Sequence, residues 1–157
     1  MTLTVTVNGT RHEVEVEARL TVADLLRDRL GLTGTHLGCE HGVCGACTIL
    51  LDGSTVRSCL LYAPQVDGCE IRTIEDVAGE EELHPIQEAM RRHHGLQCGF
   101  CTPGFVLTIL ELLSERRGPD EAEIREALSG NLCRCTGYET IVDAVLAADA
   151  TWERSVP

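Results

Sequence analysis

Residues 38–47 read Gly38-Cys39-Glu40-His41-Gly42-Val43-Cys44-Gly45-Ala46-Cys47. Their cysteines follow the pattern C-x4-C-x2-C, and eleven residues separate the last of them from Cys59. This is the plant-type spacing of 2Fe-2S ligands, and the glycines let backbone N–H groups approach the sulfurs closely. We therefore predict that a 2Fe-2S cluster is bound by Cys39, Cys44, Cys47 and Cys59. A zinc site, or buried cysteines without a metal, are the alternatives.

Four more cysteines lie in the second half of the chain, in Cys98-Gly99-Phe100-Cys101 and in Cys133-Arg134-Cys135. A C-x2-C pair can place two thiols on one side of a helical turn, whereas a helical C-x-C pair would point them to opposite sides. Cys133 and Cys135 are therefore expected on a non-helical loop. Four thiols can then converge from two loops on a second cluster, with zinc again as the alternative.

The residues after each cysteine pair carry signals for the start of a helix. Thr102 and Pro103 suit an N-cap and a first helical residue, and Thr136 with Glu139 has the sequence of a capping box. A helix is thus expected to begin directly after each pair. The positive ends of both helices would then face the anionic cluster and stabilise it.

The first half of the chain alternates apolar and polar residues around the turn Asn8-Gly9, which predicts a β-hairpin. A helix over residues 22–30 follows, with Thr21 as its cap. A second hairpin is expected from residues 48–51 and 55–61, and a last strand near residues 69–73. This order predicts a small mixed sheet that packs on one helix.

The polar stretch at residues 77–82 predicts a domain boundary, with domains over residues 1–77 and 78–157. Helical spacing and end signals then predict four helices, at residues 85–94, 103–117, 121–129 and 137–148. The predicted fold class is therefore α+β, a small mixed-sheet domain followed by a four-helix bundle.

Composition excludes several functions. The chain has 157 residues, a net charge of −12 and 13 basic residues, all of them arginine, so binding to nucleic acid would meet strong repulsion. No apolar run is long enough to span a membrane, and the N-terminus lacks a secretory signal. We expect a cytoplasmic protein whose nine cysteines bind metal rather than form disulfides. The ninth, Cys69, is expected to be a packed thiol.

Three motifs together resemble the iron-sulfur subunit of the xanthine dehydrogenase/aldehyde oxidase family of molybdenum hydroxylases. They are residues 38–47, Gln97-Cys98-Gly99-Phe100-Cys101-Thr102-Pro103-Gly104, and Gly130-Asn131-Leu132-Cys133-Arg134-Cys135-Thr136-Gly137-Tyr138. The resemblance implies a ferredoxin-like β-grasp domain, a four-helix bundle, a large partner subunit that holds molybdopterin and a medium partner subunit that holds FAD. A heterotrimer or its dimer is the implied assembly.

The resemblance also implies a role for each cluster. Cys98, Cys101, Cys133 and Cys135 would hold the cluster proximal to the molybdopterin, with Gln97 hydrogen-bonded to the pterin and Cys135 the ligand closest to it. The other four cysteines would hold the distal cluster, toward FAD. The chain would then relay single electrons from molybdenum to flavin. A freestanding two-cluster ferredoxin and a zinc-stabilised interaction module are the competing interpretations.

Overall fold

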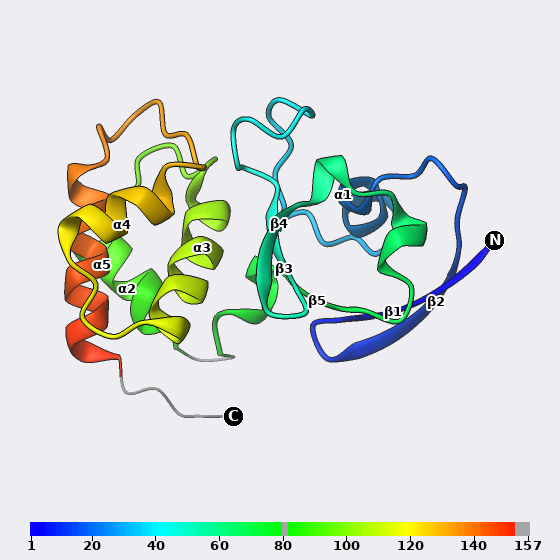
Figure 1. Cartoon of the computed structure of the whole chain (residues 1–157), viewed down its shortest axis with the longest axis horizontal. Helices are drawn as coiled ribbons and strands as arrows, with labels where there is room; N and C mark the ends of the chain where they lie inside the picture. The colour runs from blue at the N-terminus through cyan, green and yellow to red at the C-terminus, as the bar shows by residue number, and fades with distance from the viewer. Residues whose placement is uncertain (80–81, 153–157) are drawn as a thin grey trace.

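The computed structural model describes residues 1–79 and 82–152. A five-stranded sheet and one short helix occupy the N-terminal half, and four longer helices occupy the C-terminal half (Figure 1). The predicted α+β class is confirmed. Part of the expected boundary segment, residues 80–81, lies outside the described residues.

The predicted N-terminal hairpin is present, with β1 over Thr2–Val7 paired to β2 over Thr10–Glu15. Asn8 and Gly9 have φ angles of 51° and 73°, the left-handed pair that a two-residue type I′ turn requires. The inward face of β1 is fully buried. The alternation of apolar and polar residues therefore fixed which side of this strand faces the core.

The other strands are β3 (Thr48–Leu51), β4 (Ser54–Arg57) and β5 (Glu70–Arg72), and the sheet order is β2-β1-β5-β3-β4. β5 runs parallel to β1 and antiparallel to β3. The predicted strand over residues 55–61 is wrong at its end. Residues Ser58–Leu60 form a 3-10 turn, because the Ser58 hydroxyl and N–H both bond to the Cys47 carbonyl.

The predicted helix over residues 22–30 is present in a different form. α1 covers Val22–Asp24, and the chain continues through Leu25–Arg29 as a π-helical turn. The Thr21 hydroxyl accepts a hydrogen bond from the Asp24 N–H, as the cap signal predicted.

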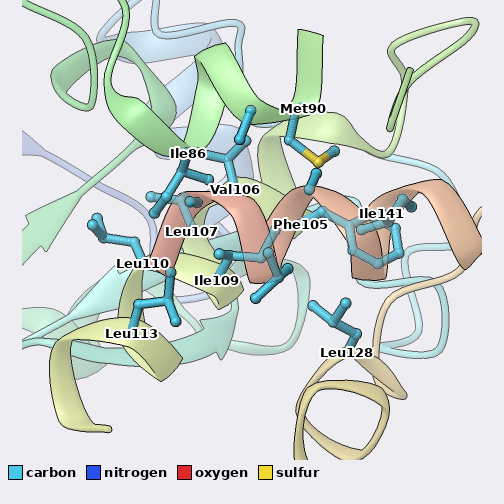
Figure 2. Close-up of a cluster of buried hydrophobic side chains, with 14 of the residues drawn as sticks. Ile86, Met90, Phe105, Val106, Leu107, Ile109, Leu110, Leu113, Leu128 and Ile141 are labelled. Carbon is cyan, nitrogen blue, oxygen red and sulfur yellow. The ribbon is translucent and has the colours of Figure 1, made fainter. Parts of the chain in front are cut away.

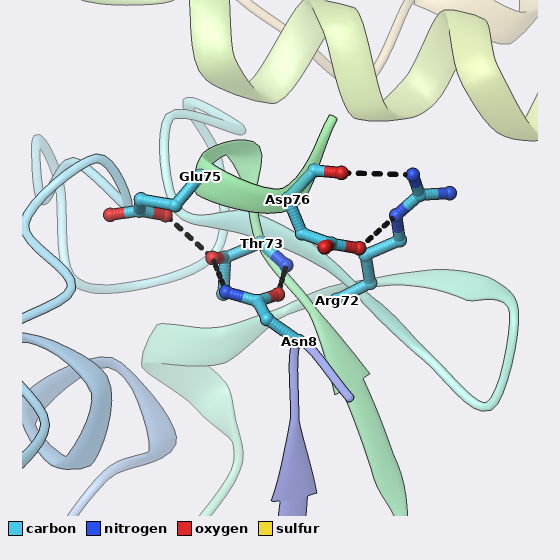
Figure 3. Close-up of polar contacts among 5 residues, drawn as sticks. All are labelled: Asn8, Arg72, Thr73, Glu75 and Asp76. Carbon is cyan, nitrogen blue, oxygen red and sulfur yellow. Dashed lines mark hydrogen bonds and ion pairs between the residues drawn. The ribbon is translucent and has the colours of Figure 1, made fainter. Parts of the chain in front are cut away.

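The Asn8 side chain ties the first turn to the end of β5 (Figure 3). Its amide nitrogen donates to Thr73 Oγ1 at 2.9 Å, and its oxygen accepts from the Thr73 N–H at 2.8 Å. Arg72, directly before Thr73, donates to the carboxylate of Asp76 at 2.8 Å. These contacts hold the segment that leaves the sheet for the helical half.

The helical half contains α2 (Pro85–Arg92), α3 (Thr102–Glu115), α4 (Glu121–Leu128) and α5 (Glu139–Thr151). α2 packs on α5, and α4 packs on both α3 and α5. The Asp120 side chain and Glu123 form a capping box at the start of α4. All four predicted helices therefore exist, with ends displaced by a few residues.

α3 is buried on almost every side (Figure 2). Phe105 and Ile109 lie in the core of the helical half, where the side chains of the other helices surround them. The same core includes Leu50 of β3, because α3 also packs against β3 and β4. One helix thus contributes to the helical core and joins it to the sheet.

Two predicted helix caps are wrong. α3 begins at Thr102 with Cys101 as its N-cap, and the Thr102 hydroxyl is buried without a hydrogen-bond partner. α5 begins only at Glu139, after Tyr138 in a left-handed conformation, so no capping box forms with Thr136. The Thr136 hydroxyl has a different partner, a cysteine sulfur, described below.

Within the part of the chain that the structure describes, no helix combines the length and apolarity that crossing a membrane requires.

Candidate metal centres

The first thiol set consists of Cys39, Cys44, Cys47 and Cys59. The first three lie in the loop before β3, which needs left-handed backbone at Glu40, Gly42 and Gly45. The fourth lies on the 3-10 turn that follows β4. All four thiols are free, and the two segments place Cys47 beside Cys59, with Cys39 close enough to Cys59 to affect its pKa.

The surroundings of the first thiol set shift the pKa values of two of its members in opposite directions. Backbone N–H groups of His41 and Cys44 point at the Cys39 sulfur and lower its pKa to about 6. The distance from the Cys44 nitrogen to Cys39 Sγ is 3.4 Å. Burial and the adjacent Cys47 thiol raise the pKa of Cys59 to about 11. The loop therefore stabilises the thiolate of Cys39, whereas the thiol of Cys59 is favoured in its neutral form until a cation is bound.

The second thiol set consists of Cys98, Cys101, Cys133 and Cys135. Cys98 and Cys101 lie between α2 and α3, and the other two lie on the loop between α4 and α5. The prediction of a non-helical loop at Cys133 is confirmed, but the C-x2-C pair is not on a helical turn, because Gly99 has a φ of 81°. Cys98 and Cys135 are exposed, with their sulfurs 3.6 Å apart. Cys101 and Cys133 pack against the helical core.

Hydrogen bonds to sulfur recur in the second thiol set. The Thr136 hydroxyl donates to Cys133 Sγ at 3.2 Å, and its N–H points at the same sulfur at 3.4 Å. Burial raises the pKa of Cys133, but these donors outweigh it and the pKa is lowered. Burial raises the pKa of its neighbour Cys101 to about 12.

The thiols within each set are arranged in pairs. In the first set Cys39 lies beside Cys44 and Cys47 beside Cys59. In the second set Cys101 lies beside Cys133, and Cys98 beside Cys135. Four thiolates on one zinc ion would all lie about 3.8 Å from one another. In residues 1–79 and 82–152, no three His, Cys, Asp or Glu side chains converge as a single ion would need. Pairs suit a 2Fe-2S cluster, in which each of two irons takes two thiolates.

Glycine makes room for a cluster in the first loop. A Cβ on Gly38 would lie 3.2 Å from Cys44 Sγ, and one on Gly42 would lie 2.5 Å from Leu60. A side chain at Gly38 would occupy the space beside the Cys44 sulfur, and one at Gly42 would displace Leu60. The free thiols, the N–H donors and this space together fit a 2Fe-2S cluster.

Gln97 is exposed beside the second thiol set, and its amide nitrogen donates to the Cys135 carbonyl at 3.2 Å. The sequence did not predict this bond within the chain. Thr136 was interpreted as a cap, although its place after a cysteine pair also suits a bond to sulfur. Cys69 packs against the sheet core apart from both sets, as expected.

Comparison with known proteins identifies the class of both halves. Residues 5–73 match the family described as 2Fe-2S iron-sulfur cluster binding domain. Residues 73–146 match the family described as 2Fe-2S binding domain. The chain is therefore built from two 2Fe-2S binding domains, one for each thiol set.

Relatives of similar length were found among curated proteins and solved structures. The nicotine 6-hydroxylase small subunit of Paenarthrobacter nicotinovorans is 62% identical over 144 residues, 92% of this chain and 87% of that protein. Caffeine dehydrogenase subunit gamma of Pseudomonas sp. (strain CBB1) is 51% identical over 154 residues, 96% of this chain and 92% of that protein. The crystal structure of quinoline 2-oxidoreductase from Pseudomonas putida 86 has 51% identity and a TM-score of 0.93, with coverage of 96% of this chain and 94% of that one.

The chain belongs to the family of small iron-sulfur subunits of the molybdenum hydroxylases. The resemblance that the three sequence motifs indicated is thereby confirmed.

Proposed function

We propose that this chain relays electrons within a molybdenum hydroxylase complex, with each thiol set binding one 2Fe-2S cluster. The eight ligands are Cys39, Cys44, Cys47, Cys59, Cys98, Cys101, Cys133 and Cys135. The observation that carries the proposal is the arrangement of free thiols in two sets of pairs, each with N–H or O–H donors directed at a sulfur. When bound, each cluster supplies a centre that accepts and releases one electron.

The chain's own residues hold these centres and tune them. N–H groups of the first loop and the Thr136 hydroxyl direct the partial positive charge of their hydrogens toward thiolate sulfurs. Packing of Cys101 and Cys133 against the helical core keeps water from one side of the second set. The domain limits of 1–77 and 78–157 and the four-helix bundle form part of this proposal, as does a cytoplasmic location, which suits nine free thiols.

The second thiol set is proposed to face a large partner subunit that holds molybdopterin. Its support is the exposure of Cys98, Cys135 and Gln97 at one surface. Exposed apolar side chains also lie in these loops, at Leu96, Phe100 and Leu132. Apolar residues around exposed ligands favour burial against a partner over free diffusion as a ferredoxin. A medium subunit with FAD and a heterotrimer or its dimer complete the proposed assembly.

The proposed substrate class of the complex is a nitrogen heterocycle. The support is the set of relatives above, whose names refer to nicotine, caffeine and quinoline. The purified complex, assayed with an artificial electron acceptor, should oxidise such heterocycles. Turnover of aldehydes alone would contradict this assignment.

Iron analysis tests the cluster content. The purified chain should hold about four irons and four sulfides, since each of two clusters contains two of each. Cys44→Ser should leave about two irons and block electron flow to flavin while substrate still reduces molybdenum. Cys69→Ser, the matched control outside both sets, should keep all four. Zinc in place of iron would refute the proposal.

Replacement of Thr136 tests the hydrogen bond to Cys133 Sγ. Thr136→Val should lower the reduction potential of the second-set cluster by roughly 50 mV, because the bond stabilises the more negative reduced state. Thr136→Ser keeps the hydroxyl and should retain the potential. A redox titration followed by electron paramagnetic resonance (EPR) measures both. Equal potentials in the valine and serine variants would show that the bond has no such effect.

Gln97→Ala tests the proposed contact with the pterin. Loss of this hydrogen bond should cost about 0.5–1.5 kcal/mol at the subunit junction, so molybdopterin retention or the rate of cluster reduction by substrate should fall. Both clusters should still assemble. Unchanged turnover and cofactor content would leave Gln97 with only its bond to the Cys135 carbonyl.

A further inference from the structure

The two cysteine loops touch directly where the sheet half meets the helical half. The Leu132 N–H donates to the Cys44 carbonyl at 2.8 Å. Cys44 belongs to the first thiol set, and Leu132 immediately precedes Cys133 of the second. A single backbone hydrogen bond therefore connects the two sets.

Glycines let the backbones approach at this junction. Gly45 has a φ of 74°, and a Cβ there would lie 2.6 Å from the Gly130 carbonyl oxygen. A Cβ on Gly104, in the first turn of α3, would overlap the Gly45 carbonyl oxygen. At these two contacts main chain packs directly on main chain, and the Asn131 side chain lies beside both glycines.

The Asn131 side chain is buried in the junction, with 2% of the residue exposed. Its amide nitrogen donates to the Gly45 carbonyl at 3.1 Å and to Thr48 Oγ1 at 3.4 Å. Its oxygen accepts from the Thr108 hydroxyl at 3.2 Å and from Arg57 at 3.5 Å. One side chain thus bonds to the first cysteine loop, to β3, to α3 and to β4.

Arg57 makes a second connection across the junction. Its guanidinium donates to Thr48 Oγ1 and to the Gly130 carbonyl, both at 2.6 Å. Arg57 is the last residue of β4, directly before the turn that carries Cys59. It therefore ties the fourth cysteine of the first set to the loop that leads to Cys133.

We propose that Asn131 and Arg57 are positioning residues that fix the separation of the two clusters and thereby set the rate of electron transfer between them. The inference rests on the proposed function. In each transfer one cluster loses one electron and the other gains it. Because such transfer slows steeply with distance and with gaps in the bonded path, a displacement of the Cys44–Leu132 contact should affect it more than it affects cluster binding.

The variants Asn131→Ala and Arg57→Met test this role in the assembled complex. The matched control is Glu111→Ala. Glu111 also joins the halves, because its carboxylate accepts hydrogen bonds from the Thr55 N–H at 2.8 Å and from the Thr55 hydroxyl at 2.6 Å. These bonds involve neither cysteine loop. Iron content reports whether clusters assemble. Freeze-quench EPR measures the rate at which one added electron exchanges between the clusters. The magnetic splitting between the two reduced clusters reports the distance between them.

Both Asn131→Ala and Arg57→Met should keep about four irons, slow the exchange about tenfold or more and reduce the splitting, whereas Glu111→Ala should change neither. Unchanged exchange and splitting in the two variants would overturn the proposal. An equal effect of Glu111→Ala would also overturn it, since the packing of the two halves as a whole would then be the cause. Loss of iron in both variants would show a role in assembly instead. Absence of iron from the unmodified chain would refute the proposed function itself.

Discussion

The packing of α3 against β3 is the interaction on which both thiol sets depend. β3 begins at the residue after Cys47, and α3 begins at the residue after Cys101. Leu50 of β3 lies in the same core as Phe105 and Ile109 of α3, so the two elements are joined by buried apolar contact. The loops before them, which have little regular structure, are held relative to each other by that contact.

The sequence predicted local features well where one segment decides them. Asn8-Gly9 specified its turn because both residues tolerate positive φ, and Asp120 with Glu123 specified a capping box. The cap prediction for Thr136 failed because α5 begins only at Glu139, so the Thr136 hydroxyl accepts from the Tyr138 N–H outside the helix and donates to Cys133 Sγ. The contact of Asn131 with Gly45 joins residues 86 positions apart, and no local pattern encodes such a contact.

Thiol electrostatics explain why cluster binding and protonation are linked in this chain. Cys39 has a pKa of about 6 because N–H groups face it, whereas burial raises that of Cys59 to about 11 and that of Cys101 to about 12. Four thiolates in a partly buried set repel one another, so Cys59 and Cys101 stay protonated without a cation. Metal binding must release those protons, which makes the affinity of each set for iron rise with pH.

The proposed relay is based on the different exposure of the two thiol pairs in the second set. In the second set Cys98 and Cys135 are exposed, while Cys101 and Cys133 lie against the helical core. The inner pair includes the cysteine next to Leu132, whose N–H bonds to the Cys44 carbonyl. Under the proposed function, an electron that enters at the exposed pair would reach the first set through this junction, which contains the buried and hydrogen-bonded side chain of Asn131. The two loops that meet at the Cys44–Leu132 contact adjoin β3 and α3, and we infer that the packing of these two elements supports the positioning roles proposed for Asn131 and Arg57.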